Sequence, residues 1–390
     1  GGTENAPLAW LPALRRWVSG VAKPPAFVPI LSAKRIYRPL LTNTIANGIT
    51  LHTVTICDLA KRDMSCVAQG VLGPPARTFY VSPTSVYVWM TPTPSDPPTS
   101  TQAAAATPAE SMAMRLPLDG GAPTVLGAVG GPVDPLSFLE KDGFLNVMLR
   151  ADVDGDGMLG PEATFGEAAL LRAPLSSFQT ALVDAPASMY RALPTPVGMT
   201  MQNRFVGDWL LYGTGTSYAR PRPAEDGRLF ALRVGSQDRP NVLPLGHPID
   251  RIEPMDSDAL VVGADARDLH FSPVSLAGAT AAAGTRYTRR GASQGELRTH
   301  GFFYRPGPES RKGIFGLPVR EGGEAGHSSL VFGSASIQFV RNDGLVLRDA
   351  GSLDARAPAK AVDDGCRASC VDWYGNARPI FVDDRVLALL

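Results

Sequence analysis

Six times along this chain, an extended apolar segment runs into a short turn and continues as a second apolar run. Each copy has the composition of a β-hairpin, and the six are Arg77–Val88, Ser137–Met148, Asn203–Tyr212, Arg251–Val262, Glu296–Tyr304 and Arg378–Leu389. Hairpin units that recur at intervals of tens of residues are typical of radially repeated β-sheets. The recurrence predicts an all-β fold.

Further extended segments follow most of the hairpins. Third segments that alternate bulky apolar with small or polar residues are Met114–Leu118, Leu170–Leu175, Arg228–Val234, Leu269–Val274 and Ile314–Val319. Period-two alternation is the signal of a strand with two different faces. Fourth runs are Pro123–Val129, Asn241–His247 and Leu345–Gly351. Four strands per unit match the blade of a β-propeller.

The sixth hairpin stops at Leu390 without a third strand, and two strands alone would leave an open edge. The missing strands lie near the other end of the chain, where Thr50–Leu59 and Ser65–Gly73 read as an isolated third and fourth strand. We therefore expect residues 48–390 to form a six-bladed β-propeller in which N- and C-terminal strands share one blade.

Three segments carry a resemblance to a known family. The runs Glu296–Val319, Phe205–Gly213 (FVGDWLLYG) and Ala377–Leu389 (ARPIFVDDRVLAL) resemble secreted bacterial proteins with a C-terminal β-propeller distantly related to WD-repeat proteins. The resemblance is patchy and covers Thr50 to Leu390. It implies an extracytoplasmic propeller and no established reaction.

Composition agrees with an exported globular protein. The chain has 390 residues, 44% of them hydrophobic, so it can bury a large core, and its formal net charge of +0 predicts no attraction to nucleic acid. No apolar run reaches the roughly 18 residues of a membrane span, so we expect no transmembrane segment. The chain begins with Gly1-Gly2, and we expect a removed signal peptide or a further upstream part.

Four cysteines form two close pairs. Cys57 and Cys66 lie on consecutive expected strands, and Cys366 and Cys370 lie in a polar segment. We expect two disulfides and an oxidising compartment, which means a secreted, periplasmic or cell-surface protein. The alternatives are free thiols in an intracellular protein, or a zinc site that uses all four thiolates.

An Asp-rich loop, residues 152–167, contains the most specific chemical motif. Carboxylates at Asp152, Asp154 and Asp156, followed by Gly157, resemble the first half of a calcium-binding loop. The carbonyl of Met158 and the side chain of Glu162 complete the expected Ca²⁺ ligands. The alternative is an acidic, solvated turn whose residues serve backbone geometry.

The five histidines are scattered and no known catalytic pattern accompanies them. His300 takes the place of the hairpin-turn aspartates in the other copies, so we expect it to be a turn residue or an inter-strand hydrogen-bonding residue. Such turn carboxylates satisfy backbone amides more often than they form a ring of ligands.

Two segments lie outside the repeats. Residues 91–109 form a Pro/Thr/Ala-rich insertion that we expect to be an exposed loop. Residues 1–47 form an N-terminal arm, in which apolar residues at helical spacing predict a short amphipathic helix. The arm either folds back over the propeller or docks on another protein subunit through Trp10, Leu14 and Trp17.

These features favour a non-enzymatic protein-interaction or scaffold module with a structural calcium site. The first alternative is a propeller enzyme, a hydrolase or a metal-dependent lactonase-like enzyme, with its active site at the central channel. The second is a surface protein that binds glycans or other polymers. Fold alone does not decide among the three.

Overall fold

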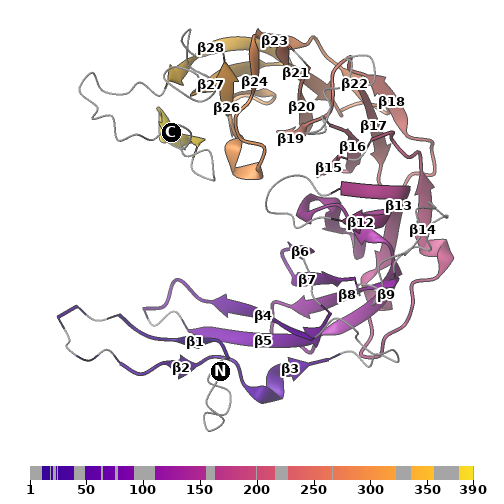
Figure 1. The fold of residues 1–390 in the computed structure, drawn as a ribbon, viewed down its shortest axis with the longest axis vertical. Coiled ribbons are helices and arrows are strands. Elements are labelled where there is room, and N and C mark those ends of the chain that lie inside the picture. The colour runs from indigo at the N-terminus through magenta and orange to yellow at the C-terminus, as the bar shows by residue number, and fades with distance from the viewer. Residues whose placement is uncertain are drawn as a thin grey trace, which may run out of the picture. The chain divides into compact units, whose positions relative to one another are not determined.

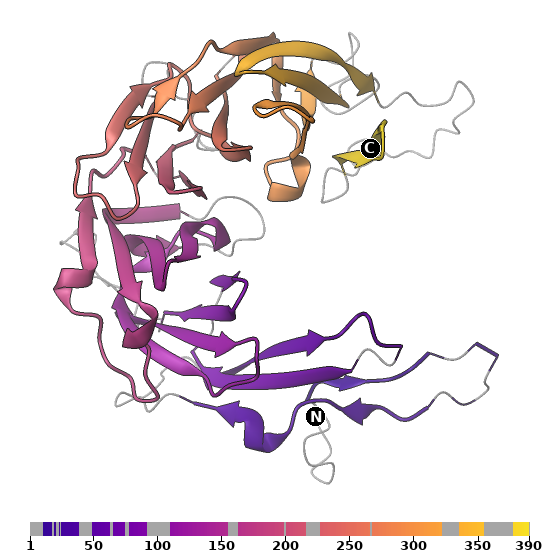
Figure 2. The same cartoon turned by 180° about the vertical axis from the view of Figure 1, so that it is seen from behind.

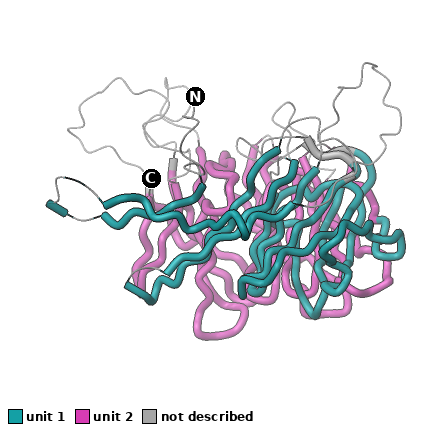
Figure 3. The backbone as a smooth tube through the Cα atoms, turned by 90° about the horizontal axis from the view of Figure 1, so that it is seen from below, with its two compact units in different colours: residues 1–153, 166–192 teal, residues 154–165, 193–390 magenta. Residues whose placement is uncertain are grey.

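The computed structural model of the chain describes residues 11–17, 19–20, 23, 25–38, 49–62, 65–74, 78–91, 110–154, 163–198, 200–215, 227–265, 267–321, 335–354 and 377–389. The regular structure of these residues consists of β-strands and short 3-10 turns, many of which are labelled in Figure 1. The predicted all-β class is confirmed. The chain divides into two compact units, coloured in Figure 3: unit 1 is Gly1–Val153 with Gly166–Ala192, and unit 2 is Asp154–Phe165 with Leu193–Leu390.

Unit 1 carries three main sheets and one small hairpin. The first sheet has the order β3-β5-β4, the second β6-β7-β8-β9, and the third β10-β12-β13-β14 with β11 also paired to β12. The hairpin joins β1 and β2. The strands are β1 (Ala13–Leu14), β2 (Val28–Pro29), β3 (Ile36–Tyr37), β4 (Thr50–Cys57), β5 (Cys66–Gly73), β6 (Thr78–Val81), β7 (Ser85–Met90), β8 (Glu110–Pro117), β9 (Thr124–Val129), β10 (Gly131–Pro132), β11 (Phe138–Lys141), β12 (Phe144–Asp154), β13 (Ala163–Pro174) and β14 (Tyr190–Leu193).

The described residues of unit 2 form four sheets. Their orders are β15-β16-β17-β18, β19-β20-β21-β22 with β23 on β21, β24-β26-β27-β28 with β25 on β26, and β29-β30. The strands are β15 (Met201–Val206), β16 (Trp209–Thr214), β17 (Arg228–Arg233), β18 (Asn241–Pro244), β19 (Arg251–Met255), β20 (Asp258–Ala264), β21 (Asp268–Ser275), β22 (Ala282–Ala283), β23 (Tyr287–Arg290), β24 (Ala292–Gln294), β25 (Phe303–Pro306), β26 (Lys312–Glu321), β27 (Ala335–Asp343), β28 (Val346–Asp354), β29 (Arg378–Val382) and β30 (Arg385–Leu389).

Short 3-10 turns connect some strands in both units. They are η1 (Ala33–Arg35), η2 (Pro135–Ser137), η3 (Leu175–Ser177), η4 (Ala187–Met189) and η6 (Thr299–Gly301).

The central strands β7 and β20 bury both of their faces, because each lies between two cores within its own unit. In β7, Tyr87 and Trp89 join the core shared with the β10–β14 sheet, whereas Val86 and Val88 join the core shared with β5. In unit 2, Val261 of β20 belongs to the core with the β15–β18 sheet. Its neighbours Leu260 and Val262 belong to the core with the β24–β28 sheet. Period-two alternation here separates two cores, which explains why these strands are apolar at nearly every position.

Five of the six predicted hairpins are confirmed. They correspond to β6–β7, β11–β12, β15–β16, β19–β20 and β29–β30. Three of their turns place Asp142, Asp256 or Asp383 in the left-handed region, with φ values of 51°, 56° and 49°. Aspartate tolerates this conformation better than most residues, so the Asp-containing turns were an informative signal.

The fifth predicted hairpin, Glu296–Tyr304, is wrong. Residues Thr299–Gly301 form η6, and the observed hairpin instead joins β25 to β26 across a longer turn. Ile314–Val319 is consequently part of a strand that pairs with β25 and β27, not a third strand, and His300 lies in η6 rather than in a hairpin turn. The Pro and Gly residues of this region interrupt the alternation of apolar and polar residues, so the strand boundaries could not be located from the sequence.

The predicted helix in the arm is also wrong for the described residues. Ala13–Leu14 forms β1, which pairs with β2, and the amide of Ile30 donates to the carbonyl of Pro12 at 3.0 Å. Pro12 lacks an N–H and disfavours helical geometry for the residue before it, so extended pairing replaces the helix. Leu11 and Leu31 are buried against Ala68 of β5, which means that this part of the arm folds back on unit 1.

The strands expected to complete the last blade are present. β4 and β5 form an antiparallel pair, and β3 of the arm adds to β5 in parallel. Among the described pairings, β4 pairs only with β5, and β30 pairs only with β29. The shared blade and the closed six-bladed ring therefore stay predictions. The predicted insertion and the Asp-rich loop fall largely outside the described residues, which resume at Glu110 and at Ala163.

Within unit 2, the C-terminal hairpin packs against the β24–β28 sheet, as Figure 2 shows. Phe381 of β29 makes an edge-to-face contact with Phe339 at a centroid distance of 6.0 Å, and the Arg305 guanidinium lies 5.2 Å above its ring. A side chain at Gly316 would overlap Pro379. Glycine at position 316 therefore permits this close approach.

A candidate binding pocket on the first strands of three sheets

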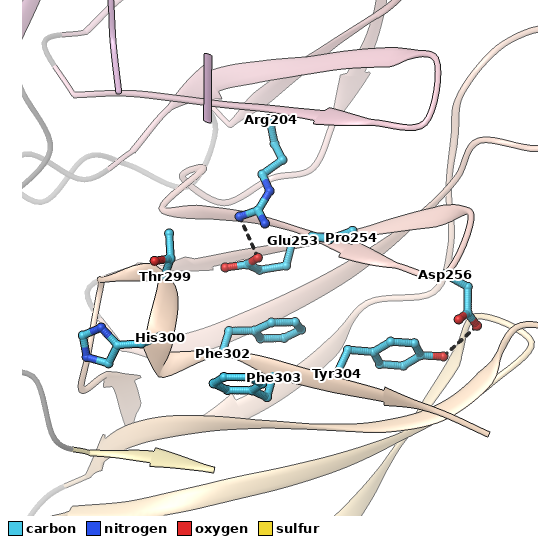
Figure 4. Close-up of a pocket in the computed structure, with 9 residues that line it drawn as sticks. All are labelled: Arg204, Glu253, Pro254, Asp256, Thr299, His300, Phe302, Phe303 and Tyr304. Atoms are coloured by element: carbon cyan, nitrogen blue, oxygen red, sulfur yellow. Dashed lines mark hydrogen bonds and ion pairs between the residues drawn. The ribbon is translucent and has the colours of Figure 1, made fainter. Parts of the chain in front are cut away.

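A pocket of about 460 Å³ opens in unit 2 and is lined by residues of three consecutive sheets. β15 contributes Arg204, β19 and its following turn contribute Glu253 to Asp256, and η6 with β25 contributes the rest. Figure 4 shows the lining residues, which are Arg204, Glu253, Pro254, Asp256, Thr299, His300, Phe302, Phe303 and Tyr304. The pocket combines charged side chains with three aromatic rings.

The polar part of the pocket is built around Glu253, whose side chain is only 5% exposed. One carboxylate oxygen lies 2.9 Å from Nη1 of Arg204. The other lies 2.7 Å from Nη1 of Arg251, a side chain that is 3% exposed. A buried carboxylate requires such compensation, because removing it from water without a partner is costly. Glu253 is thus a fixed acceptor shared by two guanidinium groups.

Arg251 ties this acceptor to the next sheet. Its Nε donates to the side-chain oxygen of Gln294 at 2.9 Å, and its Nη2 donates to the carbonyls of Glu296 and Arg298 at 2.7 and 2.9 Å. These bonds hold the segment that leads into η6. Arg251 consequently positions the pocket wall and has little capacity left for a ligand.

Arg204 differs from Arg251 in how much of its capacity is used. Its side chain is 20% exposed, and its Nη1 makes no hydrogen bond of good geometry among the described residues despite the close ion pair with Glu253. In Figure 4 the guanidinium points into the pocket. Arg204 therefore presents donor groups to the pocket interior.

His300 and Glu296 form a weaker pair beside the pocket. Nε2 of His300 lies 3.5 Å from Oε2 of Glu296, whose side chain is 5% exposed. Neither of these two atoms makes a hydrogen bond of good geometry among the described residues. The other Glu296 oxygen accepts from the backbone amide of Arg298 at 2.8 Å. His300 is therefore oriented by a buried carboxylate and keeps polar capacity.

Aromatic side chains form the opposite wall. Phe302 is 7% exposed and belongs to the core, whereas Phe303 is 46% exposed. The hydroxyl of Tyr304 donates to the carboxylate of Asp256 at 3.0 Å. Burial, followed by the neighbouring carboxylates of Asp256 and Asp258, raises the pKa of Tyr304 to about 12, against the lowering effect of Asn342. Tyr304 thus stays a neutral donor near neutral pH.

A second polar cluster lies where the connection between β18 and β19 packs on the β19–β23 sheet, and it serves structure. Nδ1 of His247 lies 2.8 Å from the carbonyl of Pro248, and its Nε2 lies 2.7 Å from the hydroxyl of Ser272. The imidazole stacks on His270, which contacts Asp265 at 2.9 Å and Thr288 at 3.1 Å. His247 and Ser272 are 0% and 2% exposed. A substrate would not reach this serine and histidine.

Two of the residues predicted as disulfide partners are placed by the structure. Cys57 and Cys66 form a disulfide, as expected from their opposed positions on adjacent strands. Cys366 and Cys370 lie outside the described residues, so the second disulfide stays a prediction.

The predicted calcium ligands are not described in atomic detail. The backbone of Asp152 and Asp154 belongs to β12, but their side chains are not described, and Asp156, Met158 and Glu162 lie outside the described residues. Calcium binding therefore stays a prediction.

The predicted partner-binding residues of the arm are separated by the structure. Leu14 lies in β1 and is partly buried, whereas the Trp17 side chain is 81% exposed. Trp10 lies outside the described residues.

Sequence reasoning missed the pocket itself. Its residues come from three segments about 50 positions apart, and no local motif joins them. One usable signal was present, because Arg251 and Glu253 are charged residues two apart in an otherwise apolar strand. Charges on a buried strand face indicate a paired, functionally interesting location.

Comparison with family models and with curated proteins finds no match to this chain. Among the described residues, no helix is long and apolar enough to cross a membrane.

Proposed function

We propose that this chain is an extracytoplasmic six-bladed β-propeller, closed by its terminal strands, that acts as a non-catalytic protein-interaction or scaffold module. The resemblance of its sequence to secreted propellers related to WD-repeat proteins supports this role. The Cys57–Cys66 disulfide supports an oxidising compartment. The observation that carries the architectural part is a pair of exposed apolar faces, one in each unit.

The first exposed face belongs to the C-terminal hairpin. Pro379 and Phe381 point toward the β24–β28 sheet, so alternate residues point to the opposite side. On that opposite side Val382, Leu387 and Leu389 are 48%, 45% and 39% exposed. A two-stranded sheet with one uncovered apolar face is marginally stable and calls for a partner.

The second exposed face belongs to β6. Tyr80 packs into the core shared with the β10–β14 sheet, whereas Phe79 and Val81 point the other way and are each 57% exposed. Closure would set the hairpin face against these residues and would pair the free edge of β30 with that of β4. The blade would then have the order β29-β30-β4-β5, which is a complete four-stranded unit.

Hydrogen exchange tests the closure. We expect the amides along the unpaired edge of β4 to be protected in the full chain and to lose protection when residues 378–390 are deleted. The substitution Leu387→Asp should act in the same direction, whereas Val242→Asp, at a position 43% exposed on β18, should leave β4 unchanged. Loop-like exchange of the β4 edge in the intact chain would refute the closed ring.

The arm supplies the proposed interaction surface. Trp17 is 81% exposed and lies beside the exposed residues Arg15 and Arg16, while Phe27 and Val28 across the arm are 62% and 64% exposed. The Arg15 guanidinium stacks over Phe27 at 4.7 Å, which presents a basic, aromatic surface. We propose that this surface docks on another copy of this chain.

Sedimentation at rising protein concentration tests the docking. We expect a concentration-dependent assembly that Trp17→Ala dissociates and that Leu59→Ala does not, because Leu59 is equally exposed at 80% but lies on the β4–β5 turn. A monomer at every concentration would remove the arm as a contact between copies.

We also propose that the Asp-rich loop binds one structural Ca²⁺ ion through Asp152, Asp154, Asp156, Met158 and Glu162. The supporting observation is the spacing of carboxylates in the sequence. Removal of Ca²⁺ by a chelator should lower the melting temperature of the wild type and have no effect on an Asp154→Asn, Asp156→Asn variant. An unchanged melting temperature for the wild type would exclude the site.

A further inference from the structure

We propose that the pocket formed by Arg204, Glu253, Thr299, His300, Phe303 and Tyr304 binds a carboxylate attached to an apolar or aromatic body. The inference deepens the binding role proposed above by naming a ligand class for one site. The pocket lies wholly within unit 2, so it does not depend on ring closure or on the arm.

The guanidinium of Arg204 favours an anion at the polar end. Arg204 and Arg251 share the carboxylate of Glu253, and the second buried carboxylate, Glu296, lies beside His300 and Arg298. Arg251 is saturated by its bonds to Glu253, Gln294 and two carbonyls. Among the described residues, Arg204 is held only through the ion pair of its Nη1 with Glu253, so its Nε and Nη2 can donate to a ligand. A planar guanidinium with unused N–H groups is well suited to a carboxylate.

Other donors lie at the same end of the pocket. Figure 4 shows Thr299 and His300 on the side where the Arg204 guanidinium enters, and Asp256 at the opposite side. The hydroxyl of Thr299 and the imidazole of His300 can add hydrogen bonds to an anion held by Arg204. The negative charge of Asp256 is kept away from that end, and Tyr304 already donates to one of its oxygens.

The aromatic wall selects the rest of the ligand. Phe303 is 46% exposed and lies between the polar end and Tyr304. Covering an exposed Phe ring and the adjacent Pro254 with an apolar group removes their surface from water, which favours binding. A bare small anion would not obtain this contribution.

Two other ligand classes fit less well. A cation would lie beside the Arg204 guanidinium and would find Glu253 already paired with two guanidinium groups. A neutral sugar could stack on Phe303 but would offer the remaining donors of Arg204 no charged acceptor. Binding of a cation and of a neutral sugar is therefore measured in the same experiment.

Titration calorimetry of the full chain with phenylacetate as the probe tests the proposal. We expect saturable binding of phenylacetate. Acetate lacks the apolar body, 2-phenylethanol lacks the charge, and phenethylamine carries the opposite charge. Each of these three should bind at least about tenfold more weakly than phenylacetate, because each loses either one charge-assisted contact or the ring contact. Glucose serves as the neutral sugar.

Matched variants locate the binding to the pocket. Arg204→Gln should weaken phenylacetate binding about tenfold or more, Arg204→Lys should retain part of it, and Phe303→Ala should weaken it severalfold. Arg228→Gln, at an exposed arginine of β17 outside the pocket, should have no effect. Thermal melts of each variant establish that it is folded.

Several outcomes would overturn the proposal. The first is the absence of phenylacetate binding at 10 mM, which is roughly the weakest affinity that can be assigned to a site. The second is stronger binding of phenethylamine or glucose than of phenylacetate. The third is unchanged phenylacetate binding by the folded Arg204→Gln variant. Failure here would leave the hydrogen-exchange and sedimentation results unaffected, so it is distinguishable from failure of the proposed scaffold role.

Discussion

Cys57 and Cys66 stand directly opposite each other on β4 and β5, with Cα atoms 4.1 Å apart and their sulfur atoms bonded. The bond closes a short loop, because the two cysteines are 9 positions apart. In the chain-entropy account, a crosslink that closes a loop of this length raises the free energy of the unfolded ensemble by about 2.5 kcal/mol. We expect Cys57→Ser, Cys66→Ser to lower the free energy of unfolding by roughly that amount.

Denaturant unfolding of the wild type and the double variant measures this effect, and a reductant should produce the same loss in the wild type alone. The exchange rates of β5 amides should rise, since β5 carries β3 and part of the arm core. Equal stability of the wild type and the variant would mean that the β4–β5 pair is held by packing alone.

Asp258 and Arg311 form an ion pair that is buried on the carboxylate side. The Asp258 side chain is 0% exposed, accepts from Nε of Arg311 at 2.6 Å and accepts from the amide of Leu276 at 2.9 Å. Removing one partner of such a pair leaves the other without compensation and costs about 3 to 5 kcal/mol. We expect Arg311→Ala to show a loss of this size.

A double-mutant cycle with Asp258→Asn separates the pair from its context. The asparagine keeps an acceptor for Leu276 but carries no charge, so the second substitution, Arg311→Ala, should cost much less in that background. Additive effects of the two substitutions would contradict a direct coupling between them.

His247 makes stability depend on pH. Burial lowers the pKa of His247 to about 4, with the nearby charges of His270 and Arg286 acting in the same direction and the Pro248 carbonyl and Asp265 opposing it. Because the folded-state pKa lies below the ordinary value near 6.5, the unfolded chain binds the proton first as the pH falls. The stability that His247 contributes is fully present above pH 6.5 and is lost progressively down to about pH 4, by about 3 kcal/mol.

Comparing wild type with His247→Gln at each pH isolates this contribution from that of the carboxylates. The difference in unfolding free energy between the two proteins should shrink as the pH is lowered from 7 to 4. A pH-independent difference between wild type and His247→Gln would show that His247 does not titrate in this range.

How much the sequence could predict depends on where the governing interactions lie. The β15–β16 and β19–β20 hairpins were predictable because the alternation, the Gly207-Asp208 turn and the Asp256 turn are all local. β26 was misassigned because Gly313, Gly316 and Pro318 weaken its strand pattern, and its partners are set by packing. Phe315 and Leu317 are buried because their shared face packs on β21, while Gly316 on the opposite face lies against Pro379 of β29.

The candidate pocket could not be predicted from local sequence patterns, for a similar physical reason. Arg204 and Glu253 belong to different sheets, and their 2.9 Å contact exists only after those sheets pack. Cys57 and Cys66, in contrast, lie on adjacent strands of one hairpin, so their pairing followed from spacing and register. Contacts within a hairpin are readable from sequence, whereas contacts between sheets require the fold.

Gly263 provides the last prediction, because its lack of a side chain makes room for the loop that holds His247. A Cβ at position 263 would overlap the carbonyl oxygen of Pro248 and would lie 2.7 Å from Nδ1 of His247. A Cβ at Gly227 would overlap the carbonyl of His247, so both sides of this loop are closely packed by backbone. Backbone atoms cannot move aside cheaply, and overpacking of this kind costs about 3 kcal/mol or more. We expect Gly263→Ala to lower the free energy of unfolding accordingly and to expose β20 amides to exchange.

Gly278→Ala, whose Cβ would lie 3.2 Å from the carbonyl of Thr280 in an exposed loop, should be nearly neutral. If Gly263→Ala is as stable as Gly278→Ala in chemical denaturation, the His247 loop does not approach β20 closely. The low pKa of His247 would then lose its cause, because that pKa depends on burial beneath this loop.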